Sequence, residues 1–397
     1  MNEKMKVGIF CSWFWKYGIG GTEMTSIALA EILSHEHSVE IVHNNPALSI
    51  DDVIKLSGRK LENIDLRYVE CRRTLPKYRN RWKLYKEDHA LNKRISGRYD
   101  LFINFVHDIP PVCHAHTGVL YVNFPFSDLS KSWRTNKRQA YPHLFYDLLR
   151  SMFYHWLLKR RLNSYQIKLS ISEFSRKWTY ERWKISSRIL YVPVDISFNA
   201  AASKENTIIS VGRFDSMKKQ AEILGIFREM TSSYHHGWKM YCAGGLFEKD
   251  VYNEIMRRFG AEDNIRIIVN SPQYELKSLL KSSKIFWHAA GYGEDEKTHP
   301  ERSEHFGRTT VEAMAAGCVP IVINKGGQPE IVQHGLNGFL WNTEDELKRY
   351  TMMLIQDERL RMKMAEAARV RAQFFSTEMF KNRFRRIIRH YGDNRQA

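Results

Sequence analysis

Short apolar runs alternate along the chain with longer stretches in which apolar residues recur at three- and four-residue intervals. Residues 7–10 form the first run, a helical pattern covers residues 24–32, and a second run follows at residues 39–42. Comparable runs continue along the whole chain, at residues 101–105, 119–122, 168–171, 189–191, 207–211, 239–242, 265–269, 285–288 and 319–323. This alternation predicts an α/β protein built on doubly wound parallel sheets.

The pattern predicts two Rossmann-like domains rather than one. At 397 residues, the chain exceeds what a single hydrophobic core usually organises. A second series of strands begins at residue 207, and the segment at residues 192–195 joins it to the first series. We therefore expect an N-terminal domain over residues 1–193 and a C-terminal domain over residues 194–376, with a central cleft between their strand ends.

Two glutamates bracket a predicted strand-loop-helix junction in the second half of the chain. Gly307 lies at the entrance of a helix expected over residues 308–316, where unpaired N–H groups and the helix dipole favour an anion such as phosphate. Glu312 lies one turn into this helix, where its carboxylate can accept hydroxyl protons from a ribose. Glu304, on the loop, can orient a sugar. The alternative is that both glutamates are ordinary solvated residues.

A second candidate site follows the strand at residues 207–211. Arg213 and Lys218 stand five residues apart across a predicted turn, so their two cations can converge on one anion. A departing diphosphate gains negative charge on its bridging oxygen, and fixed cations in a water-poor cleft stabilise that charge. The alternative is a solvated helix start.

Both segments resemble the signature of the retaining family-4 glycosyltransferases of the GT-B fold, also called glycosyl transferases group 1. The stretch from Glu304 to Glu330 is similar to their Glu-x7-Glu region, and Gly212-Arg213-Phe214 with Lys218 is similar to their diphosphate clamp. The resemblance implies a GT-B fold, a terminal helix at residues 377–397 that packs back on the first domain, and catalytic roles for Arg213, Lys218 and Glu304. It also implies that a nucleotide-sugar donor binds the residues of the two motifs, namely Arg213, Lys218, Glu304, His305, Phe306, Gly307, Arg308, Thr309 and Glu312.

Further candidates fall in the N-terminal domain. Gly20 and Gly21 belong to a glycine-rich loop that resembles the Gly-Gly-x-Glu loop of the same family, whereas Glu23 breaks the Gly-x-Gly-x-x-Gly pattern of dinucleotide-binding loops. Asn123 stands where the family often carries a histidine beside the sugar, and an asparagine cannot take up a proton. His107, at the end of a predicted strand, is either a site residue or a structural histidine.

Charge indicates an anionic partner. The chain contains 61 Lys and Arg against 44 Asp and Glu, for a formal net charge of +17. Basic residues interleave with aromatic ones over residues 72–98 and 131–161, which suits an anionic membrane surface, with Phe153, Trp156 and Leu157 as apolar positions that could insert. A core-facing stripe with solvated cations is the alternative for the second stretch. Nucleic acid is not expected, because no recognition motif accompanies the basic residues.

The remaining composition argues against several other classes of protein. No uninterrupted apolar stretch of about 18 residues predicts a transmembrane helix, and the first residues lack the apolar segment of a signal peptide. The five cysteines are widely spaced without a Cys-x-x-Cys pair, so we expect reduced thiols and no zinc site. We expect no cofactor and no required metal ion, in keeping with the lack of an Asp-x-Asp motif.

The expected function is transfer of a sugar from a nucleoside diphosphate to a hydroxyl of a glycan or lipid-linked glycan, in cell-surface polysaccharide or glycolipid biosynthesis. Retention of the anomeric configuration is implied by the resemblance. We expect the protein in the cytoplasm, peripheral on the inner face of a membrane. Two alternatives remain: a GT-B sugar-nucleotide epimerase, which product analysis without acceptor would identify, and a non-catalytic basic protein that binds nucleic acid.

Overall fold

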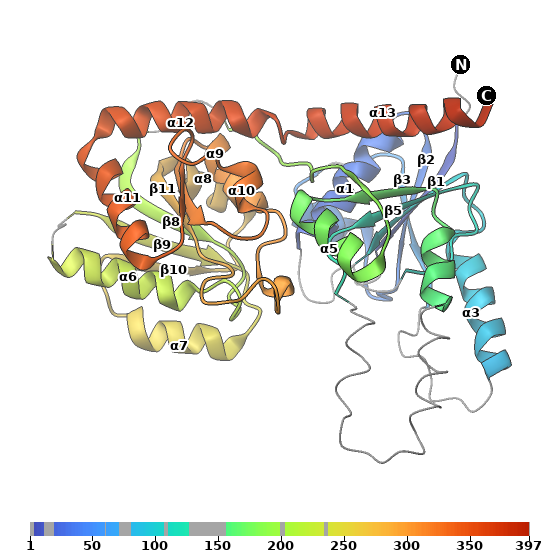
Figure 1. Ribbon diagram of the computed structural model, residues 1–397, viewed down its shortest axis with the longest axis horizontal. Coiled ribbons are helices and arrows are strands. Elements are labelled where there is room, and N and C mark those ends of the chain that lie inside the picture. Colours follow the sequence, from blue (N-terminus) through green and yellow to red (C-terminus); the bar gives the residue numbers. More distant parts are fainter. Residues whose placement is uncertain are drawn as a thin grey trace, which may run out of the picture. The chain divides into compact units, whose positions relative to one another are not determined.

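The protein forms two compact units (Figure 1). The computed structural model describes residues 4–11, 20–59, 61–70, 81–106, 110–126, 156–198, 203–233 and 237–396. The first unit consists of Met1–Leu190 and Phe384–Ala397, and the second of Tyr191–Arg383. The division after Leu190 lies three residues before the boundary that we expect from the sequence. The last helix, α13 (Thr377–Gln396), begins in the second unit, and its residues from Phe384 onward belong to the first.

The first unit is built on a parallel sheet, which has seven strands among the described residues. In sheet order the strands are β3 (Ile64–Tyr68), β2 (Ser38–His43), β1 (Lys6–Cys11), β4 (Leu101–Val106), β5 (Thr117–Val122), β6 (Ile167–Ser170) and β7 (Arg188–Ile189). The interior strands are buried almost throughout, and Ile9 of β1 lies in register with Ile41 of β2 and with Ile103 of β4. Burial on both faces explains why these strands appear in the sequence as continuous apolar runs.

Helices connect these strands. They are α1 (Gly21–Ser34), α2 (Ile50–Ser57), α3 (Arg81–Ser96), a helix at residues 156–163 and α5 (Glu173–Trp183). The sequence sets the ends of α2: the Ser49 hydroxyl accepts a hydrogen bond from the Asp52 N–H, and Gly58 ends the helix with a left-handed backbone.

The second unit repeats this architecture on a parallel sheet with six strands among the described residues. In sheet order they are β10 (Ile265–Val269), β9 (Lys239–Gly244), β8 (Glu205–Val211), β11 (Ser283–His288), β12 (Val319–Ile323) and β13 (Phe339–Trp341). Its helices are α6 (Gln220–Ser233), α7 (Lys249–Phe259), α8 (Gln273–Ser282), the 3-10 turn η2 (Pro300–Arg302), α9 (Arg308–Ala315), α10 (Gln328–Ile331), α11 (Glu344–Gln356) and α12 (Glu358–Gln373).

The strand order of each sheet reverses direction at one place. In the first unit the reversal lies between β1 and β4, and in the second it lies between β8 and β11. At such a switch point the loops that leave the carboxyl ends of two neighbouring strands diverge, which opens a crevice for a ligand. The loops that follow β8 and β11 are therefore where a ligand of the second unit is expected.

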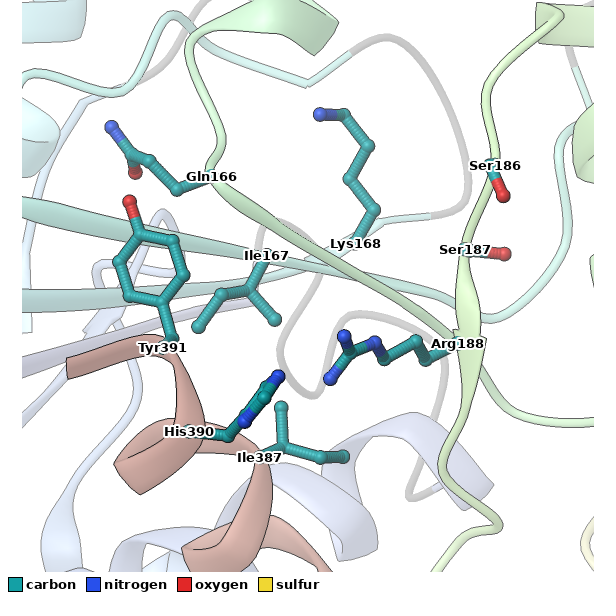
Figure 2. A pocket seen from close by; sticks show the side chains of 9 residues that line it. All are labelled: Gln166, Ile167, Lys168, Ser186, Ser187, Arg188, Ile387, His390 and Tyr391. Atoms are coloured by element: carbon teal, nitrogen blue, oxygen red, sulfur yellow. The ribbon is translucent and has the colours of Figure 1, made fainter. Parts of the chain in front are cut away.

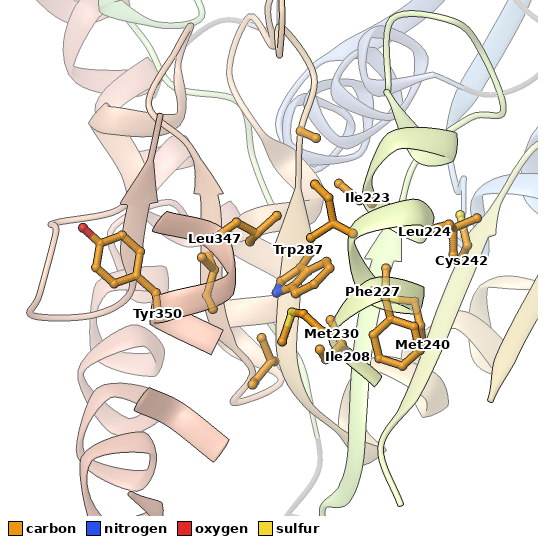
Figure 3. Close-up of a cluster of buried hydrophobic side chains, with 14 of the residues drawn as sticks. Ile208, Ile223, Leu224, Phe227, Met230, Met240, Cys242, Trp287, Leu347 and Tyr350 are labelled. Carbon is orange, nitrogen blue, oxygen red and sulfur yellow. The ribbon is translucent and has the colours of Figure 1, made fainter. Parts of the chain in front are cut away.

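A hydrophobic core holds the second sheet against its helices (Figure 3). Trp287 of β11 is fully buried, and Phe227 of α6 and Leu347 of α11 belong to the same cluster. The Trp287 Nε1 donates a hydrogen bond of 3.1 Å to the Thr351 hydroxyl, which satisfies the one polar atom of the indole. This packing fixes the strand that ends at His288 and so fixes the position of the residues that follow.

The two basic stretches of the sequence lie partly outside the described residues, since residues 71–80 and 127–155 are not described. In the helix at residues 156–163, Leu157, Leu158 and Leu162 are buried, whereas Trp156 is half exposed. Leu157 therefore packs in the core, as in the alternative of a core-facing stripe, and is not available for insertion into a membrane. None of the described helices combines the length and the apolar composition that crossing a bilayer requires.

Candidate active site

The loop after β8 is rigidly folded and places Lys218 at the switch point of the second unit. Asp215 is fully buried, and its Oδ1 accepts hydrogen bonds of 3.1 Å from the backbone N–H groups of Met217 and Lys218. The Gln220 amide donates to the Arg213 carbonyl at 2.6 Å and closes the other side of the loop. A loop held by buried side chains keeps the direction of the lysine constant, which costs little entropy when a ligand binds.

Lys218 and Glu304 form an ion pair. The Lys218 Nζ lies 2.7 Å from Glu304 Oε2, and the Nε2 of His288, at the carboxyl end of β11, lies 3.1 Å from the same oxygen. Burial alone would raise the pKa of Glu304, but the charge of Lys218 and the hydrogen bond with His288 outweigh it and hold that pKa well below its ordinary value. Glu304 is therefore ionised and can accept hydrogen bonds but not donate a proton.

A buried chain of hydrogen bonds orients His288. The Thr310 hydroxyl donates to Gln328 Oε1 at 2.9 Å, which leaves the Gln328 amide nitrogen facing His288 Nδ1 at 3.3 Å. Burial lowers the pKa of His288 despite the neighbouring carboxylate, so the ring is neutral and its hydrogen lies on Nε2. This hydrogen points at Glu304 Oε2, and the hydrogen bond helps to fix the position of the carboxylate.

The entrance of α9 offers unpaired backbone donors beside this cluster. Gly307 precedes the helix with φ 117°, a left-handed conformation that favours glycine, and a Cβ there would approach the Gln328 amide to 2.8 Å. No side chain caps the helix. Within the described part of the chain, the N–H groups of Arg308 and Thr309 have no hydrogen-bond acceptor, as expected in a first helical turn.

Two glycines pack against the segment that carries Glu304. The Gly327 N–H donates to the Glu304 carbonyl at 2.7 Å, and a Cβ on Gly326 would lie 2.1 Å from that carbonyl oxygen. The glycines serve close approach of two backbone segments, which holds Glu304 in place.

The other residues that the sequence predicts for the donor site differ in their ion pairs and in their exposure to solvent. Arg213 is paired with Asp215 at 3.3 Å and lies over the Phe247 ring. Glu312 accepts a hydrogen bond of 2.9 Å from the Arg308 Nε. His305 and Thr309 are partly exposed, whereas Phe306 is buried, so only its backbone can face a ligand.

The predicted residues of the first unit are placed as follows. Gly20 precedes α1, and its N–H donates to Glu23 Oε2 at 2.9 Å, while Gly21 is exposed. Glu23 thus caps the helix, a role that the sequence interpretation missed. Asn123 is buried after β5, and among the described residues its side-chain nitrogen has no hydrogen-bond partner. His107 lies outside the described residues.

Comparison with known proteins identifies the family. Residues 194–371 match the family described as Glycosyl transferases group 1. The second unit of the chain carries a domain of this family. The fold of the chain is GT-B: the Anabaena protein HepE in complex with UDP-glucose is similar over 97% of this chain and 100% of its own, with a TM-score of 0.67 at 15% identity.

This chain matches different shares of the length of its curated relatives. The GDP-Man:Man(3)GlcNAc(2)-PP-Dol alpha-1,2-mannosyltransferase of Dictyostelium discoideum is 25% identical over 221 residues, which is 51% of this chain but only 42% of that enzyme. The GalNAc-alpha-(1->4)-GalNAc-alpha-(1->3)-diNAcBac-PP-undecaprenol alpha-1,4-N-acetyl-D-galactosaminyltransferase of Campylobacter jejuni is 22% identical over 385 residues, 93% of this chain and 95% of that enzyme.

Sequence reasoning missed His288, Gln328 and Asp215 as parts of the site. His288 stands at the end of a predicted buried strand, which was a usable signal, because strand ends carry ligands in parallel sheets. Gln328 gave no such signal, since it meets His288 across 40 residues of sequence. In the described residues, no group of three or more His, Cys, Asp and Glu side chains is placed to hold a metal ion.

Proposed function

We propose that the protein is a retaining glycosyltransferase of family 4. In this proposal it moves a sugar from a nucleoside diphosphate to a hydroxyl of a lipid-linked glycan, at the cytoplasmic face of a membrane and in the synthesis of cell-surface polysaccharide or glycolipid. The observation that carries the proposal is the cluster of Lys218, Glu304 and His288 beside the entrance of α9.

This arrangement suits a diphosphate leaving group. The ammonium of Lys218 and the unpaired N–H groups of Arg308 and Thr309 supply fixed positive potential in this part of the second unit. The negative charge on the bridging oxygen grows as the sugar departs, so these groups stabilise the transition state more than the bound donor. Arg213 is partly exposed and can leave Asp215 to add a second cation.

The carboxylates act as hydrogen-bond acceptors for donor hydroxyls. Because Glu304 is ionised, it accepts from a sugar hydroxyl, and Lys218 prevents it from repelling the nearby diphosphate. Glu312 lies one helical turn beyond Gly307, a suitable distance for the ribose of the same donor. Neither carboxylate is required as a proton donor, so catalysis rests on positioning and on stabilising the leaving group.

The acceptor class follows from two relatives. The enzymes from Dictyostelium and Campylobacter act, by their names, on glycans linked through a diphosphate to dolichol or undecaprenol. A net charge of +17 suits an acceptor that carries a diphosphate and lies on an anionic membrane.

The test is a transfer assay with purified protein, a polyprenyl-diphosphate-linked glycan and a panel of UDP-, GDP- and ADP-sugars. We expect one donor to extend the acceptor, with the anomeric configuration of the donor retained in the product by NMR, and with activity preserved in EDTA. A parallel reaction without acceptor should leave the donor sugar unchanged. Conversion of the donor to an epimer in that control would instead identify the protein as an epimerase.

A further inference from the structure

A hollow in the first unit lies where α13 meets the starts of β6 and β7 (Figure 2). Two of the residues that line it, Lys168 and Arg188, carry cationic side chains. Because Arg188 pairs with Leu169, the side chains of Lys168 and Arg188 leave the sheet on opposite faces and cannot hold one ligand between them. Charged side chains that do converge lie in the second unit, on the loops that follow β8 and β11.

The loop after β11, residues 289–303, is long for a connection within a compact domain. It contains the short turn η2 and then leads directly to Glu304. Long loops in compact domains are usually either functional or disordered, so the contacts that hold this one are informative. The Lys325 Nζ donates to the carbonyl of Gly291, at 3.0 Å, and to the carbonyl of Glu294. These bonds tie the loop to the segment after β12, which lies on the same side of the switch point as β11.

The side chain of Glu294 ties the loop across the switch point to the segment after β8. Its Oε1 lies 3.0 Å from the Nζ of Lys219, the residue that immediately precedes α6, and its Oε2 lies 3.1 Å from Arg302 Nη1 in η2. The side chains of Lys219 and Glu294 are only 17% and 14% exposed, so water screens their attraction less than that of a surface ion pair. The hydrogen bond from Lys219 holds the pKa of Glu294 below its ordinary value, so this carboxylate is ionised near neutral pH.

Two bridges therefore join the same two segments, since Lys218 reaches Glu304 and its neighbour Lys219 reaches Glu294. The backbone of Lys219 has φ 57°, in the left-handed region that favours glycine and strains a lysine. A strained backbone persists only where the surrounding structure fixes it, and such strain is often found at functional sites. Here the strained conformation is the one in which two successive lysines both contact acidic residues of the segment after β11.

Binding of a donor would affect the two bridges differently. In the proposed function, the charge of Lys218 acts on the diphosphate, which weakens its hold on Glu304. Lys219 and Glu294 lie outside the predicted donor motifs, so their bridge stays closed at that moment.

We propose that Lys219 and Glu294 are positioning residues, whose ion pair keeps the segments of Lys218 and Glu304 in place while Lys218 engages the diphosphate. The inference rests on the proposed function, because it concerns the step in which the diphosphate departs. The pair itself touches no reacting atom and acts through Lys218 and Glu304.

Steady-state kinetics with the active donor test this role. Glu294→Gln keeps the shape of the side chain and removes its charge, so we expect kcat to fall about tenfold with a smaller change in the KM of the donor. Lys219→Gln should cause the same loss, and the double variant should lose little more, because either change alone breaks the pair. Lys219→Arg keeps the charge and should retain most of the activity. Glu262→Gln, which removes a 3.4 Å ion pair with Arg228 between α7 and β10, should leave both constants unchanged.

Lys219→Gly separates the ion pair from the stability of the fold. Glycine removes the charge as Lys219→Gln does, but it adopts a φ of 57° without strain. We therefore expect Lys219→Gly to melt at a higher temperature than Lys219→Gln and yet to share its low kcat. A kcat that recovers together with the melting temperature would show that Lys219 supports only the fold, and would overturn the proposal.

Hydrogen-deuterium exchange of the full chain without donor tests the tether apart from activity. We expect faster exchange over residues 289–303 in Glu294→Gln than in the wild type or in Glu262→Gln. In a protein that transfers sugar, unchanged exchange over this loop, or a kcat that Glu294→Gln leaves intact, overturns the role of the pair alone. Faster exchange in Glu294→Gln of a protein that transfers no sugar from any donor of the panel overturns the proposed function, and this role with it.

Discussion

At the scale of single residues, Glu304 contacts polar groups from several parts of the second unit. Lys218 neutralises its charge, His288 donates to it, and the Gly327 N–H holds its backbone carbonyl. These partners come from three separate segments of the unit: the loop after β8, the end of β11 and the loop after β12. The site is therefore pre-organised before any donor arrives, which favours catalysis by fixed charges.

Lys218→Ala should lower kcat by roughly 10²-fold while changing KM much less, because the charge that Lys218 stabilises grows chiefly in the transition state. Steady-state kinetics with the active donor measure both constants. Lys249→Ala, which removes an exposed lysine of α7, serves as the control and should keep both constants. A raised KM with an intact kcat would instead make Lys218 a binding residue.

Glu312→Gln should weaken donor binding by about 1.5–3 kcal/mol, since one charged acceptor is lost from the ribose. Isothermal calorimetry with the nucleoside diphosphate measures the change. Glu366→Gln is the matched control, because Glu366 forms a similar helical ion pair with Arg369 on α12, which lies outside the predicted donor motifs. Equal affinity in the folded Glu312→Gln variant would refute the ribose contact.

Protonation of His288 should make the stability of the folded protein depend on pH. Burial lowers its pKa below the ordinary value of 6.5, so the unfolded chain binds a proton more readily than the folded one. Its contribution to stability is thus present above pH 6.5 and is lost as the pH falls below that value. Between about pH 7.5 and pH 5.5, the melting temperature of His288→Gln should fall less than that of the wild type. Parallel curves for the two proteins would contradict this assignment.

At the scale of elements, the sequence predicted the strands that are buried on both faces. The interior strands β11 and β12 are continuous apolar runs and were located within two residues of their ends. Strand β3 was missed because it lies at a sheet edge, where Asp65 and Arg67 interrupt the apolar pattern. Strand β13, Phe339–Trp341, is too short to give a pattern.

The residues of the candidate site could likewise be predicted only where the signal is local in sequence. Glu304 and Lys218 belong to motifs that are local in sequence and could be predicted. The hydrogen bonds from Gln328 to His288 and from Thr310 to Gln328 join separate elements, and no local pattern specifies which side chains meet there. Arg213 was predicted to share an anion with Lys218, but the buried carboxylate of Asp215 competes for its guanidinium.

Gly326, in the loop after β12, and Gly335, between α10 and β13, offer a matched pair of substitutions. Gly326 and Gly335 both have positive φ, 62° and 76°, so alanine at either position costs about 1–2 kcal/mol of backbone strain. Only at Gly326 would the new Cβ also meet a backbone oxygen, that of Glu304, whereas nothing lies near Gly335. Gly326→Ala should therefore destabilise the protein more than Gly335→Ala in urea unfolding, and should also reduce transfer. Equal losses of stability would indicate that the backbone near Gly326 shifts at little cost to make room for the new Cβ.

At the scale of the whole molecule, the net charge of +17 should govern attachment to membranes. Binding to anionic liposomes should fall when the Debye length shrinks to roughly 3 Å at 1 M salt. Trp156 is half exposed, so Trp156→Ser should fold normally and should weaken any salt-resistant remainder. Leu157→Ser is expected to destabilise the fold, because Leu157 is buried. Sedimentation with liposomes at low and high salt measures the binding, and its independence of salt would refute membrane attachment.

The division of α13 between the two units has a consequence for synthesis on the ribosome. The first unit includes Phe384, which is buried, and Arg385, which pairs with Glu36. These residues leave the ribosome only after the whole second unit has been made. Until then the first unit lacks the part of α13 that belongs to it. Folding of the first unit of a newly made chain can therefore be completed only after the second unit has been synthesised, although most of the first unit is made first.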